Sequence, residues 1–298
     1  TYLRQRKLRR YKFIDDERRN YPLKILSRVM EVSQSGYYAW RKRLIEPPRL
    51  RRKTLAQLVR NGYWENRRRY GARRIKASLN REGIRIGKFQ VGSLMREQEL
   101  VAIGPKKFKP KTTDSKGTAA SPNLLKDIKL EECAVGKVII GDLTYIPMQN
   151  GSWSYLAIWE DKVTRGIIGW SLAQEMTAEL VISALQKAIG KGKVKAGAII
   201  HSDRGSQYAA NDFRKLLQVN CFRQSMSGKG NCYDNAFVES FFRTLKVELI
   251  YIRKFKTREE AKAAIFEFIE VWYNRQRLHS SLDYMTPEQY ELKQLSAA

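Results

Sequence analysis

Cysteine and histidine are scarce in this 298-residue chain, and they form no metal-binding pattern. The three cysteines, Cys133, Cys221 and Cys232, include no C-x-x-C pair, and only His201 and His279 are available to join them. A zinc site is therefore not expected. So few cysteines also favour a reducing compartment, and we expect a cytoplasmic protein.

Long apolar runs are missing as well. No stretch approaches the roughly 20 residues needed to cross a bilayer, and the first residues do not have the pattern of a signal peptide. Hydrophobic residues nevertheless make up 43% of the chain, which is enough for a core in two or three domains. The composition therefore argues against a membrane protein.

Acidic residues are few compared with basic ones, and the imbalance is concentrated in one half of the chain. There are 57 Lys and Arg against 30 Asp and Glu, which gives a net charge of +27. Residues 1–130 carry a net charge of +24, whereas residues 131–298 carry only +3. A basic half joined to a nearly neutral half indicates a polyanion-binding part attached to a part with another task.

The basic half divides into three segments by its pattern. Residues 1–50 begin with a charged lead-in over 1–20, followed by two short helices about a tight turn, with Ser33 and Ser35 as caps. This pattern suits either a helix-turn-helix or a plain helical hairpin. Residues 51–103 read as a second helical DNA-binding module with helices near 52–61, 72–81 and 88–98. Residues 104–130 are a basic linker rich in Pro, Lys, Ser and Thr.

Several cations and aromatic residues in these segments are candidate DNA contacts. Each one alone is more often a solvated surface residue, but as clusters they favour DNA. The candidates are Tyr37, Tyr38, Arg41, Arg67, Arg68, Arg69, Arg73, Arg74, Lys76, Lys106, Lys107 and Lys109.

The second half of the chain contains several segments with the pattern of β-strands. The runs KVIIGDLTYIP, SYLAIWEDKV and RGIIGWSLAQ predict three consecutive strands. A helix with Thr177 as N-cap, the apolar strand AGAIIHSD, a helix, the strand CFRQSM and a last helix follow. The order βββαβαβα predicts a ribonuclease-H-like core over residues 131–256, with a mixed five-stranded sheet. A C-terminal helical extension follows over residues 257–298.

Three carboxylates occupy special places in this predicted core. Asp142 lies in the first strand, Asp203 ends the fourth strand, and Glu239 lies in the first turns of the last helix. Because the first and fourth strands are neighbours in this topology, the two aspartates face each other. We expect apolar surroundings for Glu239, so that its charge needs compensation. Two Mg²⁺ ions, or Mn²⁺ as a substitute, supply that compensation and activate phosphodiester chemistry.

Each carboxylate also has a simpler interpretation. A lone Asp at a strand end is often a turn former, and Glu239 can favour the positive end of its helix. Lys246 adds weight to the metal hypothesis, because it lies two helical turns after Glu239 and can hold a phosphate beside the ions. Arg243 is a further DNA candidate. Residues that can support the active site or merely pack are His201, Gln207, Asn231 and Asn235.

These motifs carry a family resemblance. The segments GDLTYIP, HSDRGSQY, SGKGNCYDNAFVESFFRTLKVE and YNRQRLHSSLDYMTPEQY resemble the DDE transposases of the insertion-sequence-three family, within the retroviral-integrase superfamily. Asp142, Asp203 and Glu239 fall on the D, D and 35-spaced E of that pattern, and Lys246 falls on the basic residue seven positions later. In place of a tryptophan common just before the first aspartate, the chain has Val138 to Ile140, which we interpret as a packing position.

The resemblance implies an activity and partners. It implies an enzyme that binds the terminal inverted repeats of an insertion sequence, cleaves a 3′ end and transfers the strand, using divalent metal. It further implies double-stranded DNA as partner, a homo-oligomer of two or more chains, and a first-reading-frame protein, separate or fused, on bacterial nucleoid DNA. The alternatives are a metal-dependent nuclease of the same fold, which cuts without joining, and a catalytically silent DNA-binding regulator.

Overall fold

The computed structural model describes residues 2–45, 52–104, 121–126, 128, 133–228 and 236–296, with side chains in the first range from residue 8 to 42. Two compact units are present, Thr1–Leu58 and Val59–Ala298. In the described part of the chain, no helix is both long and apolar enough to span a membrane. The units are described separately.

The first unit is built around three helices, α1 (Tyr2–Glu17), α2 (Leu23–Val29) and α3 (Gln34–Ile45). The two short helices expected about a tight turn are therefore present as α2 and α3, and Ser33 caps α3 by accepting a hydrogen bond from the Gly36 N–H at 3.1 Å. The expected charged lead-in is itself helical. It folds because Ile14 packs against Leu26 and Tyr37 in a small core.

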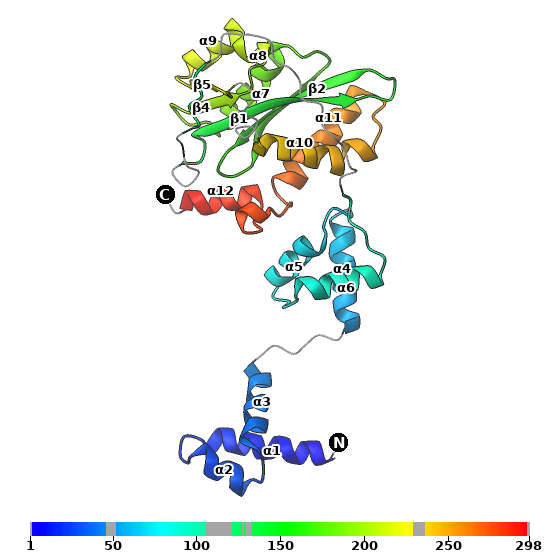
Figure 1. Cartoon of the computed structure of the whole chain (residues 1–298), viewed down its shortest axis with the longest axis vertical. Coiled ribbons are helices and arrows are strands. Elements are labelled where there is room, and N and C mark those ends of the chain that lie inside the picture. Colours follow the sequence, from blue (N-terminus) through cyan, green and yellow to red (C-terminus); the bar gives the residue numbers. More distant parts are fainter. Residues whose placement is uncertain are drawn as a thin grey trace. The chain divides into compact units, whose positions relative to one another are not determined.

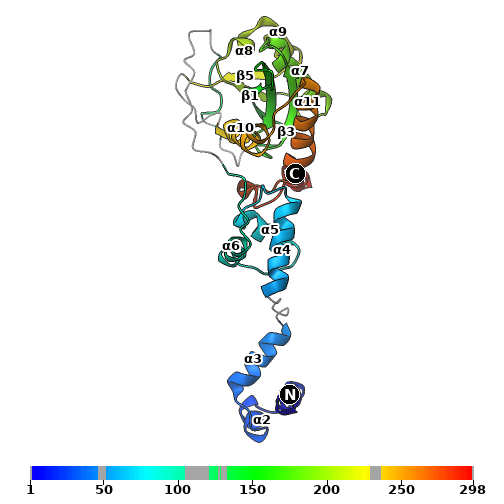
Figure 2. The same cartoon turned by 90° about the vertical axis from the view of Figure 1, so that its right-hand side faces the viewer.

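A second helical group follows, with α4 (Arg52–Glu65), α5 (Ala72–Arg81) and α6 (Lys88–Glu97), close to the predicted bounds (Figures 1 and 2). The helices form because apolar residues recur at steps of three and four, for example Ile75 with Leu79 and Val91 with Leu94 and Met95, and all of these are buried. The turn after α5 passes through Gly83 at φ +82°, a left-handed conformation that favours glycine.

The larger unit contains the mixed five-stranded sheet predicted from the sequence. Its order is β3-β2-β1-β4-β5; β2 is antiparallel to β1 and to β3, and β4 is parallel to β1 and to β5. The strands are β1 (Val138–Pro147), β2 (Trp153–Asp161), β3 (Ile167–Ala173), β4 (Ile199–Ser202) and β5 (Arg223–Met226). This topology is the ribonuclease-H-like arrangement, so the predicted fold class is confirmed.

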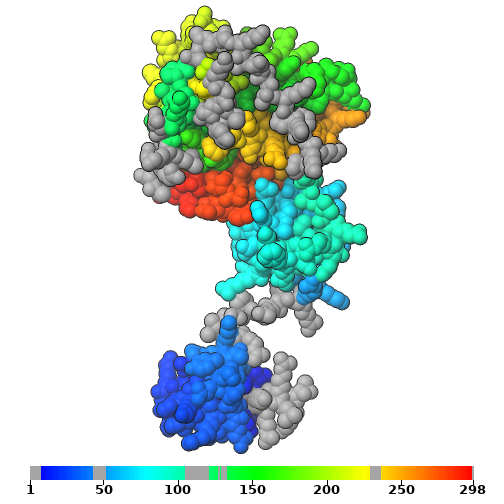
Figure 3. Space-filling model, viewed as in Figure 1, coloured from blue at the N-terminus to red at the C-terminus, as the bar shows by residue number. Residues whose placement is uncertain are grey.

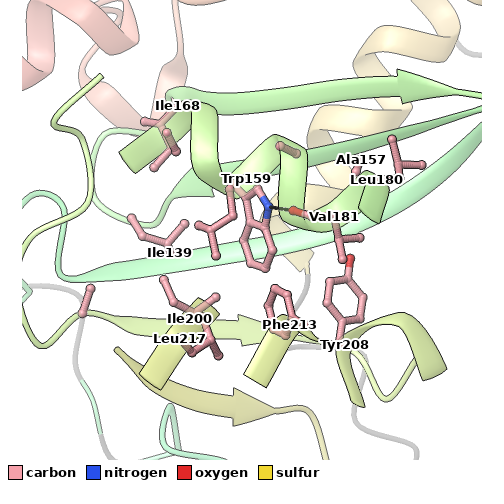
Figure 4. Packing of buried hydrophobic residues seen from close by; sticks show 14 of the residues in the cluster. Ile139, Ala157, Trp159, Ile168, Leu180, Val181, Ile200, Tyr208, Phe213 and Leu217 are labelled. Carbon is pink, nitrogen blue, oxygen red and sulfur yellow. Dashed lines mark hydrogen bonds between the residues drawn. The ribbon is translucent and has the colours of Figure 1, made fainter. Parts of the chain in front are cut away.

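One face of the sheet packs on the core that α7 (Ala178–Gly190), α8 (Ser206–Ala209) and α9 (Asn211–Val219) cover (Figure 1). Trp159 lies at its centre, stacked on Phe213 with ring centroids 5.9 Å apart (Figure 4). The Trp159 indole N–H donates to the Val181 carbonyl at 3.1 Å, so its one polar atom is satisfied in the core. Thr177 occupies the N-cap of α7, as predicted, but its side chain makes no capping hydrogen bond.

The other face is covered by the C-terminal part of the chain, from Ala236 onward. It contains α10 (Ala236–Glu248), η3 (Ile250–Ile252), α11 (Arg258–Phe266), η4 (Glu267–Tyr273), η5 (Ser280–Leu282) and α12 (Pro287–Ser296). Ile265, Phe268, Ile269 and Trp272, which recur at helical spacing in this segment, are buried. In the space-filling view the orange-to-red C-terminal segment lies next to α10, which is gold (Figure 3).

Candidate active site

Asp142 lies in β1, and Asp203 directly follows the end of β4, the parallel strand next to β1. The last aligned pair between β1 and β4 is Ile140 with His201. Asp142 follows Ile140 by two residues, and Asp203 follows His201 by two residues. Because side chains alternate between faces with a period of two, Asp142 and Asp203 share the face that α10 covers. The adjacency predicted from the topology is confirmed.

The two aspartates influence each other electrically. The pKa of Asp142 is raised from 3.8 to about 7, by burial first and then by the nearby charges of Asp203 and Glu239, against the opposing effects of the Leu143 N–H and Lys246. Burial also raises the pKa of Asp203, opposed by the hydrogen bond that its Oδ1 accepts from the Gly205 N–H at 2.9 Å. Negative charge at this spot is therefore costly in the absence of a cation.

Helix α10 brings Glu239 and Lys246 to this face. The charge of Glu239 raises the pKa of Asp142, and the charge of Lys246 lowers it. The Lys246 ammonium lies 4.5 Å from the centre of the Tyr145 ring. Burial lowers the pKa of Lys246, while Asp142 opposes that shift. The carboxylates and the cation are thus neighbours, as the spacing of seven residues predicted.

The expectation that Glu239 lies in apolar surroundings is wrong. Its side chain is exposed, and the buried stripe of α10 runs instead through Val238, Phe241, Phe242 and Leu245. Glu239 follows Val238 by about 100° around the helix, which is enough to turn it out to solvent. Water therefore solvates its charge, and its presence in the helix does not by itself require a metal.

The donor set is of the kind that hard divalent cations prefer, because all of its ligands are carboxylate oxygens. Asp142 and Asp203 meet on one face and repel each other, which a cation between them relieves. Among the described residues, no three His, Cys, Asp or Glu side chains are gathered closely enough to form a complete metal site. The aspartate pair fits a metal, with Glu239 as the nearby third carboxylate.

The candidate supporting residues divide into packed and accessible ones. His201 is fully buried, and its two ring nitrogens lie 2.8 Å from Ser225 Oγ and 3.1 Å from Ser227 Oγ, so both nitrogens contact serine hydroxyls inside the core. Gln207 is half-buried in the short helix α8. Asn231 and Asn235 lie outside the described residues.

The N-terminal candidates for DNA contact differ in accessibility. The ring of Tyr37 is fully buried and its hydroxyl donates to Asp15, so the predicted DNA contact of Tyr37 is wrong. Tyr38 is 54% exposed. Arg41 lies 3.3 Å from the Asp15 carboxylate and is half-buried. Tyr37 was misassigned because an aromatic at helical spacing serves a small core as readily as a groove.

The arginine cluster of the second helical group is divided by burial. Arg68 and Arg73 are exposed, Lys76 is half-buried, and Arg67 forms an ion pair with Glu267. Arg69 is only 7% exposed, and the half-buried Arg74 donates from Nε to the Leu278 carbonyl at 2.9 Å. The last two therefore face the C-terminal segment rather than open solvent.

Arg243 and three lysines of the linker are the remaining predicted DNA contacts. Arg243 is exposed on α10. Lys106, Lys107 and Lys109 lie outside the described residues. One basic residue was missed: Arg165, in the turn between β2 and β3, lines a cavity with four other arginines. No sequence signal could have identified it, because its partners come from distant segments.

The sequence matches three protein-family descriptions. Residues 134–232 and residues 239–295 each match a family described as "Integrase core domain", and residues 50–108 match one described as "HTH-like domain". The integrase matches cover the sheet with its aspartates and the segment from Glu239 onward.

Curated relatives match over most of the chain. The chain is 37% identical over 289 residues to "Transposase InsF for insertion sequence IS3A" of Escherichia coli (strain K12), covering 96% of this chain and all of that protein. It is 42% identical over 241 residues to "Transposase for insertion sequence element IS904" of Lactococcus lactis subsp. lactis (strain IL1403), covering 80% of this chain and 94% of that protein.

Solved structures with a similar arrangement include retroviral integrases. A simian T-cell lymphotropic virus intasome matches with a TM-score of 0.44 and 16% identity, over 72% of this chain and 70% of that one. The HTLV-2 integrase catalytic core domain in complex with magnesium matches with a TM-score of 0.38 and 15% identity, over 53% of this chain and 97% of that one.

The sheet topology, the paired aspartates and the integrase-core matches define a polynucleotidyl transferase that acts on DNA. The helical DNA-binding group before the core agrees with that class. Given its identity to curated relatives over nearly its full length, the chain belongs to the insertion-sequence-three family of transposases. It is a DNA transposase.

Proposed function

We propose that this transposase binds the terminal inverted repeats of an insertion sequence and catalyses metal-dependent 3′-end cleavage and strand transfer at Asp142, Asp203 and Glu239. The observation that carries the proposal is that Asp142 and Asp203 share one face of the sheet with Glu239 of α10 nearby; burial first, and then the charges of Asp203 and Glu239, raise the pKa of Asp142 to about 7. A cluster of carboxylates that destabilises the empty protein is characteristic of a site built for a cation and its substrate.

Asp142 and Asp203 would hold the divalent ion, with Glu239 as the third ligand. We propose Mg²⁺, with Mn²⁺ as a substitute, and two ions in the complex with DNA. When bound, such ions polarise a phosphodiester and lower the pKa of an attacking water or hydroxyl. Lys246 contributes a positive charge next to Asp142, where it can hold a non-bridging phosphate oxygen.

The basic part of the chain would hold the DNA. We propose that residues 1–50 and 51–103 recognise the inverted repeats, that residues 104–130 link them to the core at 131–256, and that residues 257–298 extend the core. The net charge of +24 over residues 1–130 supports this division. Exposed Arg68, Arg73 and Tyr38 are the accessible contacts among those predicted.

Two separate DNA ends must meet in one complex, so we propose a homo-oligomer of two or more chains on the bacterial nucleoid. A first-reading-frame protein, separate or fused, is the proposed protein partner. The homo-oligomer follows from the chemistry of joining two ends, whereas the first-reading-frame partner is implied by the family resemblance.

The test is a cleavage and joining assay with labelled DNA carrying the inverted repeats that flank the gene. Wild-type protein in Mg²⁺ is compared with Glu239→Gln and with Glu259→Gln, an exposed glutamate in the first turn of α11. We expect joined products from the wild type and the Glu259 variant, and none from the Glu239 variant although it still binds DNA. Cut but unjoined ends from the wild type would favour a nuclease, and binding alone would favour a regulator.

A further inference from the structure

A cavity of about 530 Å³ lies beside α10, away from the paired aspartates. Five arginines line it: Arg69, Arg74, Arg165, Arg243 and Arg277. They come from the turn before α5, from α5, from the turn between β2 and β3, from α10, and from the segment after η4. All of these belong to the unit Val59–Ala298.

Positive charge in this cavity is not balanced by its own carboxylates. Glu248 is paired with Arg277 at 3.0 Å, and both side chains are less than 10% exposed. Burial raises the pKa of Glu160, the other carboxylate in the lining, to about 8, so it is mostly protonated at pH 7. His279 is uncharged, because burial and the nearby arginines lower its pKa to about 2. Even with Glu160 ionised beside Arg165, the lining holds five arginines and two glutamates, so three arginines remain without a counter-charge in it.

Two of the arginines have buried N–H groups without a hydrogen-bond acceptor among the described residues. These are Nε and Nη1 of Arg69 and Nη1 of Arg165, in side chains that are 7% and 8% exposed. An unsatisfied N–H of a buried cation is expensive, so such groups are rare unless a ligand satisfies them. Both side chains are part of the cavity lining.

Aromatic rings hold these two guanidinium groups in place. The Arg69 guanidinium carbon lies 4.8 Å from the centre of the Trp272 ring and 5.1 Å from that of Phe268. The corresponding carbon of Arg165 lies 3.4 Å from the centre of the Phe237 ring. Stacking occupies the faces of a planar guanidinium and leaves its in-plane N–H groups for an oxyanion, the geometry that suits bidentate phosphate binding.

We propose that this cavity binds a phosphate group of the DNA backbone, outside the carboxylate site. The inference rests on the proposed function, because the same helix joins the two places. Glu239 and Lys246 lie on one side of α10, and Ser240, Thr244 and Val247 on the adjacent side line the cavity. A DNA strand that reaches the carboxylates therefore passes along α10, and the cavity anchors one of its phosphates.

The first test adds one negative charge at the cavity rim. Ser280 is exposed and lines the cavity, so Ser280→Asp places a carboxylate there without burying it. Ser280→Asn has nearly the same shape and reports the steric cost, and Ser296→Asp gives the full chain the same net charge at an exposed position outside the cavity. The readout is the Kd for a labelled inverted-repeat duplex, measured in Ca²⁺ to prevent cleavage.

We expect Ser280→Asp to weaken DNA binding about tenfold relative to Ser280→Asn, as for one pair of like charges in partly screened surroundings. Ser296→Asp should weaken it much less. Arg165→Gln, if it folds, should reduce the slope of log Kd against log salt by about 1, which corresponds to one lost phosphate contact. Equal affinities for the Asp and Asn variants at position 280 would overturn the proposal, whether or not the Arg165 variant folds.

A second measurement distinguishes a DNA phosphate from a free one. Inorganic pyrophosphate, at constant ionic strength, should raise the Tm of the wild type more than that of Ser280→Asp. If pyrophosphate does so while DNA affinity is the same in both, the cavity binds a free phosphate compound and the assignment to DNA is wrong. If the wild type joins DNA and Ser280→Asp binds DNA normally, the proposed function stands and the cavity inference fails.

Discussion

Replacing Asp142 by asparagine is expected to stabilise the metal-free protein at high pH. Burial and the charge of Asp203 raise the pKa of Asp142 from 3.8 to about 7. The native state thus binds a proton that the unfolded chain has already released between these two values. Stability therefore falls as pH rises from about 4 to about 7, and the full penalty is present at pH 8.

The size of the effect follows from the shift. A pKa shift of about three units corresponds to about 4 kcal/mol in the free energy of unfolding, at about 1.4 kcal/mol per unit. We reduce this to about 2 kcal/mol because the Asp142 side chain retains some contact with solvent. The asparagine keeps the acceptor for the Leu143 N–H, which bonds Asp142 Oδ1 at 2.8 Å. At about 2 °C per kcal/mol for a unit of this size, Tm should rise by about 4 °C.

The assay is thermal unfolding in EDTA at pH 8 and pH 5. The stabilisation by Asp142→Asn should shrink to less than half at pH 5, where the native Asp142 is mostly protonated. Asp283→Asn, at an exposed position, is the control and should change Tm little at either pH. An equal gain at both pH values, or no gain at pH 8, would refute the reasoning.

Three other substitutions test the packing and the site. Glu248→Gln leaves the buried Arg277 unpaired and should lower the free energy of unfolding in urea by about 3 kcal/mol. Glu288→Gln, in an exposed pair, should lower it by less than about 1 kcal/mol. Equal losses would contradict this. In Gly169→Ala the new methyl group would overlap the backbone of α7 and should destabilise the protein by about 2 kcal/mol. In Gly190→Ala the methyl group meets nothing within 4 Å, so this variant should be neutral or stabilising. An unchanged stability of Gly169→Ala would refute the close packing of β3 on α7. Lys246→Gln should slow DNA joining about tenfold, and an unchanged joining rate would exclude a role for this cation.

The sheet and its aspartates could be predicted from local patterns. Alternating and continuous apolar runs predicted the strands, and the parallel pairing of β1 with β4 followed from the element order. This pairing alone places Asp142 next to Asp203. Residues Val138 to Ile140 stand where the family commonly has a tryptophan, and we interpreted this as a packing position. All three residues are buried.

The rotation of α10 and the helical nature of residues 2–17 could not be read from the sequence. The sequence of α10 also fits a stripe through Ala236, Phe237, Phe241 and Leu245, but Ala236 is exposed and the core begins at Val238. Because Phe237, Phe241 and Phe242 are all apolar, the sequence allows two rotations of α10 about its axis. Contacts with the sheet select between these rotations. The charged N-terminal segment becomes a helix because tertiary contacts of Ile14 stabilise it.

The arginine cavity was beyond reach of sequence reasoning for another reason. Arg69, Arg165 and Arg277 are separated by about 100 residues each, and none belongs to a local motif. Only the fold places their guanidinium groups around one cavity. Charge counting favoured DNA as the partner and included Arg69 among the candidate contacts, but it gave no sign that Arg69 lines a cavity.

The most direct test of the account is whether Asp203 contacts a metal ion while DNA is joined. A cysteine thiolate is a soft ligand that suits Mg²⁺ poorly and Mn²⁺ better. Asp203→Cys and the wild type are incubated with inverted-repeat DNA in Mg²⁺ or in Mn²⁺, and joined strands are measured. The account predicts joining by the wild type with both ions and by the variant with Mn²⁺ alone. Equal joining by the variant with both ions would contradict metal binding by Asp203.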